Sequence, residues 1–146
     1  MKITKMTSDH VMQVAQLEQL CFSAPWSKNA VTGELTNPLS CWLVAVDGEQ
    51  VCGYVGSQAV LGEADMMNIA VDPVYRRKGI AKQLVEALIN ELKAAGNYQL
   101  TLEVRASNEP AINLYRSMGF AQAGLRPKYY TKPTEDALIL RKEWEV

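Results

Sequence analysis

A short apolar segment followed by three cations and a glycine forms a possible anion-binding site in the middle of the chain. The segment reads Asn68-Ile-Ala-Val-Asp-Pro-Val-Tyr-Arg-Arg-Lys-Gly-Ile-Ala81, which indicates a strand, a turn and the start of a helix. A helix start exposes unpaired N–H groups and the positive end of the helix dipole, so it attracts anions. Gly79 has no Cβ, so a ligand can approach its backbone closely. The three cations are Arg76, Arg77 and Lys78, and Lys82 adds a fourth charge directly after the segment. Together these features predict a site for a phosphate-bearing ligand.

The glycine spacing differs from the two most familiar phosphate-binding loops. The sequence contains no G-x-G-x-x-G, which gives no support for a Rossmann dinucleotide site. It contains no G-x-x-x-x-G-K-[ST] either, which gives no support for a P-loop. What remains is Arg76-x-x-Gly79-x-Ala81. Taken alone, this hexapeptide fits a solvated basic helix start with a packing glycine as well as it fits a phosphate site.

Apolar periodicity predicts the elements that position this segment. Helical spacing from Val11 to Leu20 indicates a first helix capped by Ser8 or Asp9, and Ser27 begins a second. Two more helices are expected at 78–95 and 110–118, and strands at 2–6, 41–46, 50–61, 64–71, 99–104, 120–130 and 137–141. A helix between the strands 64–71 and 99–104 implies a right-handed parallel crossover. The expected fold is mixed α/β (α+β). It has a mostly antiparallel sheet of about seven strands with a central parallel pair, flanked by four helices.

Composition restricts the class of protein. At 146 residues the chain is expected to form one domain over residues 1–146. Its formal net charge of -1 argues against direct binding of nucleic acid by phosphate neutralisation. The longest apolar run, Cys41–Val46, is too short to cross a bilayer, and the first residues lack the apolar part of a signal peptide. We therefore expect no membrane association and a cytoplasmic location.

The chain has few cysteine and histidine residues that could act as nucleophiles or metal ligands. Cys21, Cys41 and Cys52 are odd in number, lack metal-type spacing and fit a reducing compartment, the last two as buried thiols. His10 is the only histidine, which argues against a zinc site and against a serine–histidine triad. No metal is expected.

Two blocks of sequence together carry a family resemblance. The strand–turn–R-x-x-G-x-A–helix block is similar to the pyrophosphate-binding segment of the GCN5-related N-acetyltransferase (GNAT) family. A second block follows downstream: Leu102-Glu-Val-Arg-Ala-Ser-Asn108, Ala111-Ile-Asn-Leu-Tyr115 and Gly119-Phe120. With Phe22-x-x-Pro25-Trp26-Ser27 and Tyr129-Tyr130, the chain resembles the ribosomal-protein-alanine N-acetyltransferases over nearly its whole length. Ala81 in place of glycine is a common variant in that family.

The resemblance implies acetyl-coenzyme A as cosubstrate and assigns residues to it. Backbone groups of the strand before the loop would bind the pantetheine arm and the acetyl carbonyl, and these belong to Ile69, Ala70 and Val71. Backbone N–H groups of the loop would bind the pyrophosphate, and these belong to Arg77, Lys78, Gly79, Ile80, Ala81 and Lys82. Asn108 would contact the cofactor arm, and it also fits a simple N-cap ahead of Pro110.

The resemblance also implies the two catalytic groups. Glu103 would be the base that accepts the amine proton, and Tyr115 the acid that protonates the departing thiolate. Without the resemblance, a lone glutamate in a strand is more commonly solvated or salt-bridged. Tyr115 likewise falls at helical spacing with Ala111 and Met118, which is typical of a core tyrosine.

The acceptor is the least constrained part of the interpretation. In the fold implied by the resemblance, Phe22, Trp26, Tyr129 and Tyr130 would flank the acceptor groove, although each also fits hydrophobic packing. The family's usual acceptor is the N-terminal alanine of a small-subunit ribosomal protein, attacked directly without a covalent enzyme intermediate. Other protein N-termini, lysines or small amines remain as acceptors, and an acyl-coenzyme A sensor without turnover remains as a non-enzymatic alternative. The oligomeric state is open.

Overall fold

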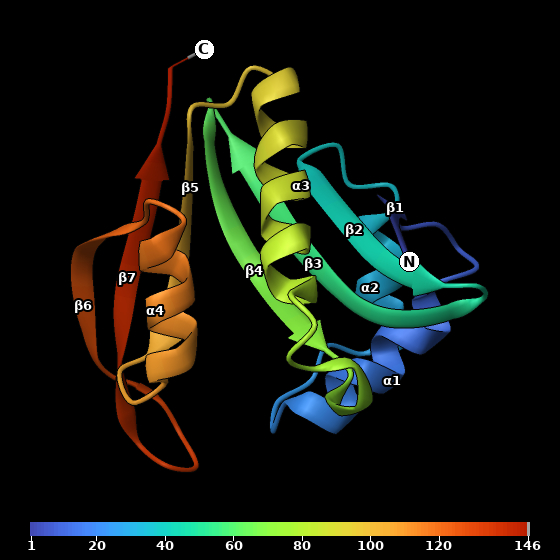
Figure 1. The fold of residues 1–146 in the computed structure, drawn as a ribbon, viewed down its shortest axis with the longest axis horizontal. Coiled ribbons are helices and arrows are strands. Elements are labelled where there is room, and N and C mark those ends of the chain that lie inside the picture. The colour runs from blue at the N-terminus through green and yellow to red at the C-terminus, as the bar shows by residue number, and fades with distance from the viewer. Residues whose placement is uncertain (146) are drawn as a thin grey trace.

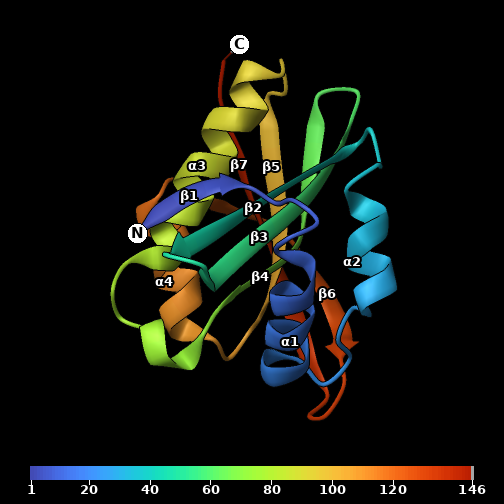
Figure 2. The same ribbon diagram turned by 90° about the vertical axis from the view of Figure 1, so that its right-hand side faces the viewer.

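The computed structural model describes residues 1–145, which form one twisted seven-stranded sheet with helices on both faces (Figures 1 and 2). The strand order across the sheet is β1-β2-β3-β4-β5-β7-β6. The strands are β1 (Lys2–Lys5), β2 (Ser40–Asp47), β3 (Gln50–Val60), β4 (Glu63–Val71), β5 (Gln99–Arg105), β6 (Ala121–Tyr130) and β7 (Glu135–Glu143). All neighbouring strands are antiparallel except β4 and β5. The predicted fold class is therefore confirmed.

The helices divide between the two faces of the sheet. Helices α1 (Val11–Cys21) and α2 (Lys28–Glu34) cover one face, and α3 (Ile80–Ala94) and α4 (Glu109–Ser117) cover the other (Figures 1 and 2). A short 3-10 turn, η1 (Pro73–Tyr75), connects β4 to the segment before α3. No helix within residues 1–145 combines the length and the apolar character that a membrane span requires.

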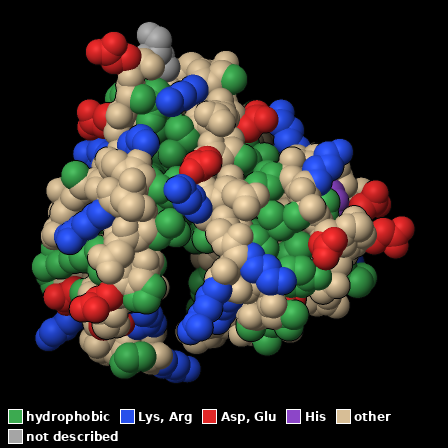
Figure 3. Space-filling model, viewed as in Figure 1, with side chains coloured by type: hydrophobic (Ala, Val, Ile, Leu, Met, Phe, Trp, Pro, Cys, Tyr) green, Lys and Arg blue, Asp and Glu red, His purple; other side chains and the backbone are tan. Residues whose placement is uncertain are grey.

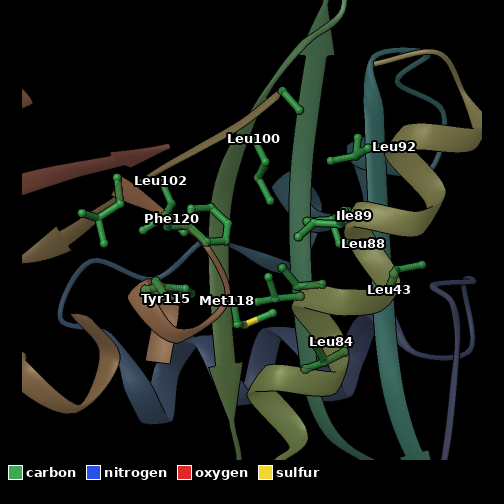
Figure 4. Packing of buried hydrophobic residues seen from close by; sticks show 14 of the residues in the cluster. Leu43, Leu84, Leu88, Ile89, Leu92, Leu100, Leu102, Tyr115, Met118 and Phe120 are labelled. Carbon is green, nitrogen blue, oxygen red and sulfur yellow. The ribbon is translucent and has the colours of Figure 1, made fainter. Parts of the chain in front are cut away.

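A hydrophobic core on each face fixes these helices. The larger core lies under α3 and α4, where Leu84 and Leu88 of α3 are fully buried against the sheet (Figure 4). Complete burial of one leucine side chain contributes about 1.5–3 kcal/mol, so α3 is held firmly on β2, β3 and β4. The smaller core lies under α1 and α2 and contains Trp42 and Tyr54, whose rings stack with centroids 5.9 Å apart.

The central parallel pair separates along its length. Strands β4 and β5 are paired at Glu63–Gln99, Ala64–Leu100 and Asp65–Thr101. Beyond this point the register of β3 and β4 shifts at Gly56/Ser57, and β4 bends away from β5. Figure 1 shows the two strands diverging, and Figure 3 shows a hollow between the two halves of the molecule with Lys and Arg side chains along part of its rim. The second halves of β4 and β5 therefore line an opening in the sheet.

Two predicted helix starts are wrong. The first helix begins at Val11, and its N-cap is His10, not Ser8 or Asp9; the His10 ring instead accepts a hydrogen bond from Thr7 N–H at 3.0 Å. Helix α3 begins at Ile80, not Lys78, because Arg77 and Gly79 adopt left-handed φ angles of +65° and +75° that no α-helix accommodates. The predicted cap of the second helix is confirmed, since Ser27 Oγ accepts from Ala30 N–H at 3.0 Å. Of the two thiols expected to be buried, Cys52 is buried and Cys41 is partly exposed.

The contact between β3 and Trp42 generates a stability prediction. A Cβ at Gly56 would overlap the buried indole ring of Trp42, which is held between Trp26 and Tyr54. We expect Gly56→Ala to lower the free energy of unfolding by about 1–3 kcal/mol in a urea titration. Gly33→Ala is the control, because Gly33 lies in α2, where a Cβ would meet no atom within 4 Å. Gly33→Ala should raise stability by about 0.4–1 kcal/mol, and equal effects of the two changes would contradict the packing argument.

Candidate active site

The start of α3 is a cradle of free backbone N–H groups. The first main-chain hydrogen bond of this helix runs from Gln83 N–H to Gly79 O, at 3.1 Å. The N–H groups of residues 77–82 precede that bond, and the positive φ angles of Arg77 and Gly79 turn this backbone before the helix begins. A Cβ at Gly79 would meet no atom within 4 Å, so the space beside it is open. This geometry suits an anion such as a pyrophosphate.

The cations around this cradle make different contacts with the rest of the protein. Arg76 Nε donates to Val71 O at 3.4 Å and its guanidinium lies 3.9 Å from Cys21 Sγ, so this side chain braces the end of β4. Lys78 lies over the ring of Tyr75 at 5.4 Å from its centroid. Lys82 forms an exposed pair with Glu86 at 3.9 Å, which contributes little to stability and leaves the ammonium accessible to an anion.

The predicted strand residues lie on the open part of β4. Val71, Ala70 and Ile69 pair with Gly53, Tyr54 and Val55 of β3 along one edge. Their other edge faces the opening, because the pairing with β5 ends at Asp65. Backbone groups on that edge are available to an extended polar chain, in the manner of strand addition. Ile69 and Val71 also pack against the larger core, and Ala70 lies in the smaller one.

Asn108 caps the helix on the other side of the opening. Its Oδ1 accepts a hydrogen bond from Ala111 N–H at 3.3 Å, and Pro110 occupies the first turn of α4. The expected N-cap is thus confirmed. The side-chain amide nitrogen remains a donor that a ligand could use.

Glu103 lies at the opening, and only one of its two carboxylate oxygens has a polar partner. Its Oε1 lies 3.3 Å from Arg126 Nε of β6. Its Oε2 is buried and has no hydrogen-bond partner, a state shared among the described residues only with Ser40 Oγ. Buried polar atoms without partners are rare in native proteins and gather at functional sites. A carboxylate oxygen in this position is suited to accept a proton or a hydrogen bond from a bound amine.

Tyr115 approaches from the opposite face of the sheet. Leu102 and Val104 face the core under α3 and α4, so the side chain of Glu103 between them points to the other face. Tyr115 lies in that core, only 5% exposed, with its ring at 5.6 Å from Phe120 (Figure 4). Tyr115 thus packs as a core tyrosine, which was the alternative to a catalytic role. Burial, followed by the nearby Tyr130, raises the pKa of Tyr115 to about 12, so its phenol stays protonated at neutral pH.

Tyr129 and Tyr130, near the end of β6, lie close enough to Glu103 for its charge to affect their pKa values. The rings of Tyr129 and Tyr130 meet edge to face at 5.1 Å. The Glu103 carboxylate is the main cause that raises the pKa of Tyr129. Burial, followed by Glu103, raises the pKa of Tyr130 to about 12. Tyr130 therefore lies within the electrostatic reach of both Glu103 and Tyr115, and both tyrosines remain neutral hydrogen-bond donors.

Arg105 organises this corner and was not anticipated from the sequence. Its guanidinium stacks on Tyr130 at 4.5 Å from the ring centroid and donates to Thr131 O and Pro133 O, both at 3.0 Å. It also pairs with Glu135 at 3.2 Å, and that carboxylate accepts from Ser107 N–H. The contact is unpredictable from sequence, because it links the end of β5 to a turn about 30 residues downstream. No local pattern encodes such a contact.

The remaining aromatic candidates lie on the far side of the opening. Phe22 and Trp26 belong to the connection between α1 and α2 and pack partly against the smaller core. The Trp26 ring lies 5.3 Å from Trp42. Figures 1 and 2 show this connection and the β6–β7 hairpin at the same end of the molecule. The four predicted aromatic residues therefore come from two segments at the end where the sheet is open.

Glu18 of α1 is a second residue that sequence reasoning missed. It is fully buried and accepts a hydrogen bond from Trp26 N–H at 2.8 Å. A signal for it existed, because Glu18 follows Val11 by seven residues and so falls on the buried stripe of the helix. A carboxylate on an apolar stripe indicates a buried polar contact.

Comparison with known proteins agrees with this geometry. The model of the acetyltransferase (GNAT) family matches residues 11–120. The chain is 43% identical over 130 residues to the [ribosomal protein bS18]-alanine N-acetyltransferase of Salmonella typhimurium, covering 86% of this chain and 85% of that protein. An uncharacterised protein of Mycobacterium leprae is 39% identical over 97% of this chain, which spans 40% of that longer protein.

A solved structure is also similar throughout. The ribosomal-protein-S18-alanine N-acetyltransferase of Escherichia coli superimposes with a TM-score of 0.91 at 35% identity, covering 99% of this chain and 94% of that one. The family match extends over most of the chain and includes β4, the cradle at the start of α3, β5 and α4. The chain therefore belongs to the GNAT family of acetyltransferases.

Proposed function

We propose that this protein transfers the acetyl group of acetyl-coenzyme A to the N-terminal alanine amine of the small-subunit ribosomal protein bS18, in the cytoplasm. The observation that carries the proposal is the opening between β4 and β5, which has an anion cradle at one end and a half-free carboxylate on its wall. The names of the relatives support the choice of acceptor, since two of them act on this alanine.

The cradle at the start of α3 would hold the pyrophosphate of the donor, and the free edge of β4 would hold its pantetheine arm. Backbone N–H groups of residues 77–82 supply the donors at the cradle, and Lys82 adds an accessible charge. On β4 the binding groups are the main-chain atoms of Ile69, Ala70 and Val71, and Asn108 contributes its amide from α4. Acetyl-coenzyme A supplies the activated thioester, and the protein supplies position and proton transfer.

Glu103 is the base in this proposal. Oε2 accepts the proton of the incoming amine directly or through a water molecule, while Arg126 holds Oε1. An α-amine has a pKa near 8 and a lysine amine about 10.4, so freeing lysine at pH 7 costs roughly 3 kcal/mol more. A single carboxylate base therefore favours an N-terminal amine.

Tyr115 is the acid. Its phenol is protonated at neutral pH, because burial raises its pKa to about 12. A neutral phenol can give its proton to a departing thiolate. The acceptor peptide would lie between Phe22 and Trp26 on one side and Tyr129 and Tyr130 on the other, with tyrosine hydroxyls as donors to its backbone.

The first test is an acceptor panel read by mass spectrometry. The protein is incubated with acetyl-coenzyme A and one acceptor at a time. The acceptors are a bS18 N-terminal peptide, a version of that peptide that has a blocked α-amine and an internal lysine, and small amines. Transfer to the free α-amine alone is expected. Transfer only to lysine or small amines would exclude the N-terminal assignment, and binding of acetyl-coenzyme A without any transfer would indicate a sensor.

Glu103→Gln tests the base. We expect kcat to fall by about 10²–10⁴-fold with the Kd for acetyl-coenzyme A unchanged, since the amide cannot accept the proton. Glu63→Gln is the control, because Glu63 lies at the other end of β4 beside Tyr98. A Glu103→Gln variant as active as the control would remove Glu103 from the mechanism.

Tyr115→Phe tests the acid and its pH dependence. The ring and its packing against Phe120 are kept, so the fold should persist while kcat falls by about 10²-fold. Because the pKa of Tyr115 is raised to about 12, its ionisation causes no loss of wild-type rate below about pH 10. An alkaline loss of rate in that range that disappears in the Phe variant would contradict this assignment.

Gly79→Ala tests the cradle. Gly79 has φ +75°, so a Cβ strains the loop that presents the N–H groups, and we expect the Kd for acetyl-coenzyme A to rise about tenfold by calorimetry. Gly48→Ala in the β2–β3 turn is matched, because Gly48 has φ +63° and equally open surroundings. It should destabilise the fold similarly and leave the Kd unchanged. Equal Kd changes in both variants would place the phosphate site elsewhere.

A further inference from the structure

Glu18 is a buried carboxylate that the acetyl transfer itself does not use. It lies in α1, is 0% exposed, and forms no ion pair within the part of the chain that the structure describes. Removing a carboxylate from water without a cation costs several kcal/mol unless hydrogen bonds replace the water. Hydrogen bonds to the Glu18 side chain must therefore offset the cost of its burial.

Three donors from three different segments converge on Glu18. Trp26 N–H donates to Oε1 at 2.8 Å, and Asn68 Nδ2 of β4 donates to Oε2 at 2.7 Å. The hydroxyl of Tyr54 on β3 also donates to Oε2. Burial, followed by the Glu18 carboxylate, raises the pKa of Tyr54, so this hydroxyl keeps its proton and remains a donor. Hydrogen bonds to a charged acceptor are about twice as strong as neutral ones.

Glu18 also holds both ends of the connection between α1 and α2. Its main-chain oxygen accepts from Phe22 N–H at 3.0 Å, and its side chain accepts from Trp26 N–H. The segment 22–27, here called the acceptor loop, is otherwise irregular. It runs from the C-cap of α1 to the N-cap of α2, Ser27. The main-chain bond ends α1 whatever residue stands at position 18, so the bond from Trp26 is the one that depends on the glutamate.

The third segment held by Glu18 is the strand that borders the opening. Asn68 lies on β4 directly before Ile69, next to the shift of register at Gly56/Ser57 where β4 bends from β5. The hydrogen bond from Asn68 to Glu18 therefore ties the acceptor loop to the strand that borders the opening.

We propose that Glu18 is a positioning residue that fixes the acceptor loop, with Phe22 and Trp26, at a set distance from β4, and so determines the affinity for the acceptor peptide. The inference rests on the proposed function, because it assigns the loop to acceptor binding. Glu18 touches neither substrate and takes no part in proton transfer. Its effect is to keep the loop ordered before the peptide arrives, so that binding does not have to order it.

A matched buried glutamate provides the control. Glu34 of α2 is 8% exposed and also accepts from three side chains, Asn37 at 3.1 Å, Trp42 at 3.3 Å and Gln58 at 2.7 Å. None of these donors belongs to the acceptor loop or to β4. Substitution of Glu34 therefore reports the cost of leaving one buried and two partly buried donors unpaired, without a hydrogen bond to the acceptor loop or to β4.

The experiment compares Glu18→Met with Glu34→Met. Both should lower the free energy of unfolding, because each leaves buried donors without an acceptor. Glu18→Met alone should raise the KM for the bS18 peptide about tenfold, with the KM for acetyl-coenzyme A within about twofold of wild type. Hydrogen exchange in residues 22–27 should accelerate in the same variant and stay unchanged in Glu34→Met.

Each outcome decides between the two proposals. Equal changes of the two KM values in Glu18→Met, or unchanged exchange in the loop, would overturn the positioning role. A wild-type protein that fails to acetylate the peptide would overturn the proposed function instead, while the exchange experiment would still test the contact. If Glu18→Met does not fold, Glu18→Gln replaces it. Its one carboxamide oxygen cannot serve all three donors, so a peptide KM raised about threefold is expected and an unchanged one is contradictory.

Discussion

The divergence of β4 from β5 is the constraint on which the rest of the structure depends. Parallel strands normally exchange hydrogen bonds along their whole length, and here three residue pairs carry the contact. The cost of leaving backbone groups unpaired is acceptable only where a ligand or water can satisfy them. The opening is therefore a weakness of the sheet, and it is the site that we propose for the ligand. Helix α3 packs on β2, β3 and β4, and the same core contains buried side chains of α4.

The site is assembled from groups that lie on different layers around this opening. The anion cradle belongs to the start of α3, the carboxylate to β5 and the phenol to α4. Side chains alternate along β5, so Glu103 lies on the face of the sheet opposite to the core that contains Tyr115. In the proposed reaction, the proton acceptor and the proton donor would therefore come from opposite faces of the sheet. Tyr130 is coupled electrostatically to both of them.

Buried polar contacts complete the walls of the opening. Arg105 binds the β6–β7 turn to the end of β5, and Glu18 binds the acceptor loop to β4. Such contacts add little net stability compared with apolar packing, but they specify one arrangement of the segments they join. Both lie beside the aromatic residues proposed to contact the acceptor. Specificity for an acceptor would thus depend on residues that never touch it.

Local sequence determined the elements and the family of this protein. Period-two and period-3.6 apolar patterns, with turn residues between them, were sufficient for seven strands and four helices, since these preferences act over a few residues. The R-x-x-G-x-A segment and the block from Leu102 to Phe120 identified the GNAT family. Even here the start of α3 was misplaced, because two residues with positive φ depend on the loop as a whole.

Only the tertiary structure decided which groups meet. The pairing of Glu103 with Arg126, the stacking of Arg105 on Tyr130 and the hydrogen bond from Trp26 to the buried Glu18 all join residues from different segments. The register of the sheet and the course of the loops set these contacts, and no local pattern of residues reveals them. The free oxygen of Glu103 is the clearest case. A glutamate in a strand becomes a candidate base only when its surroundings bury one oxygen and leave it without a partner.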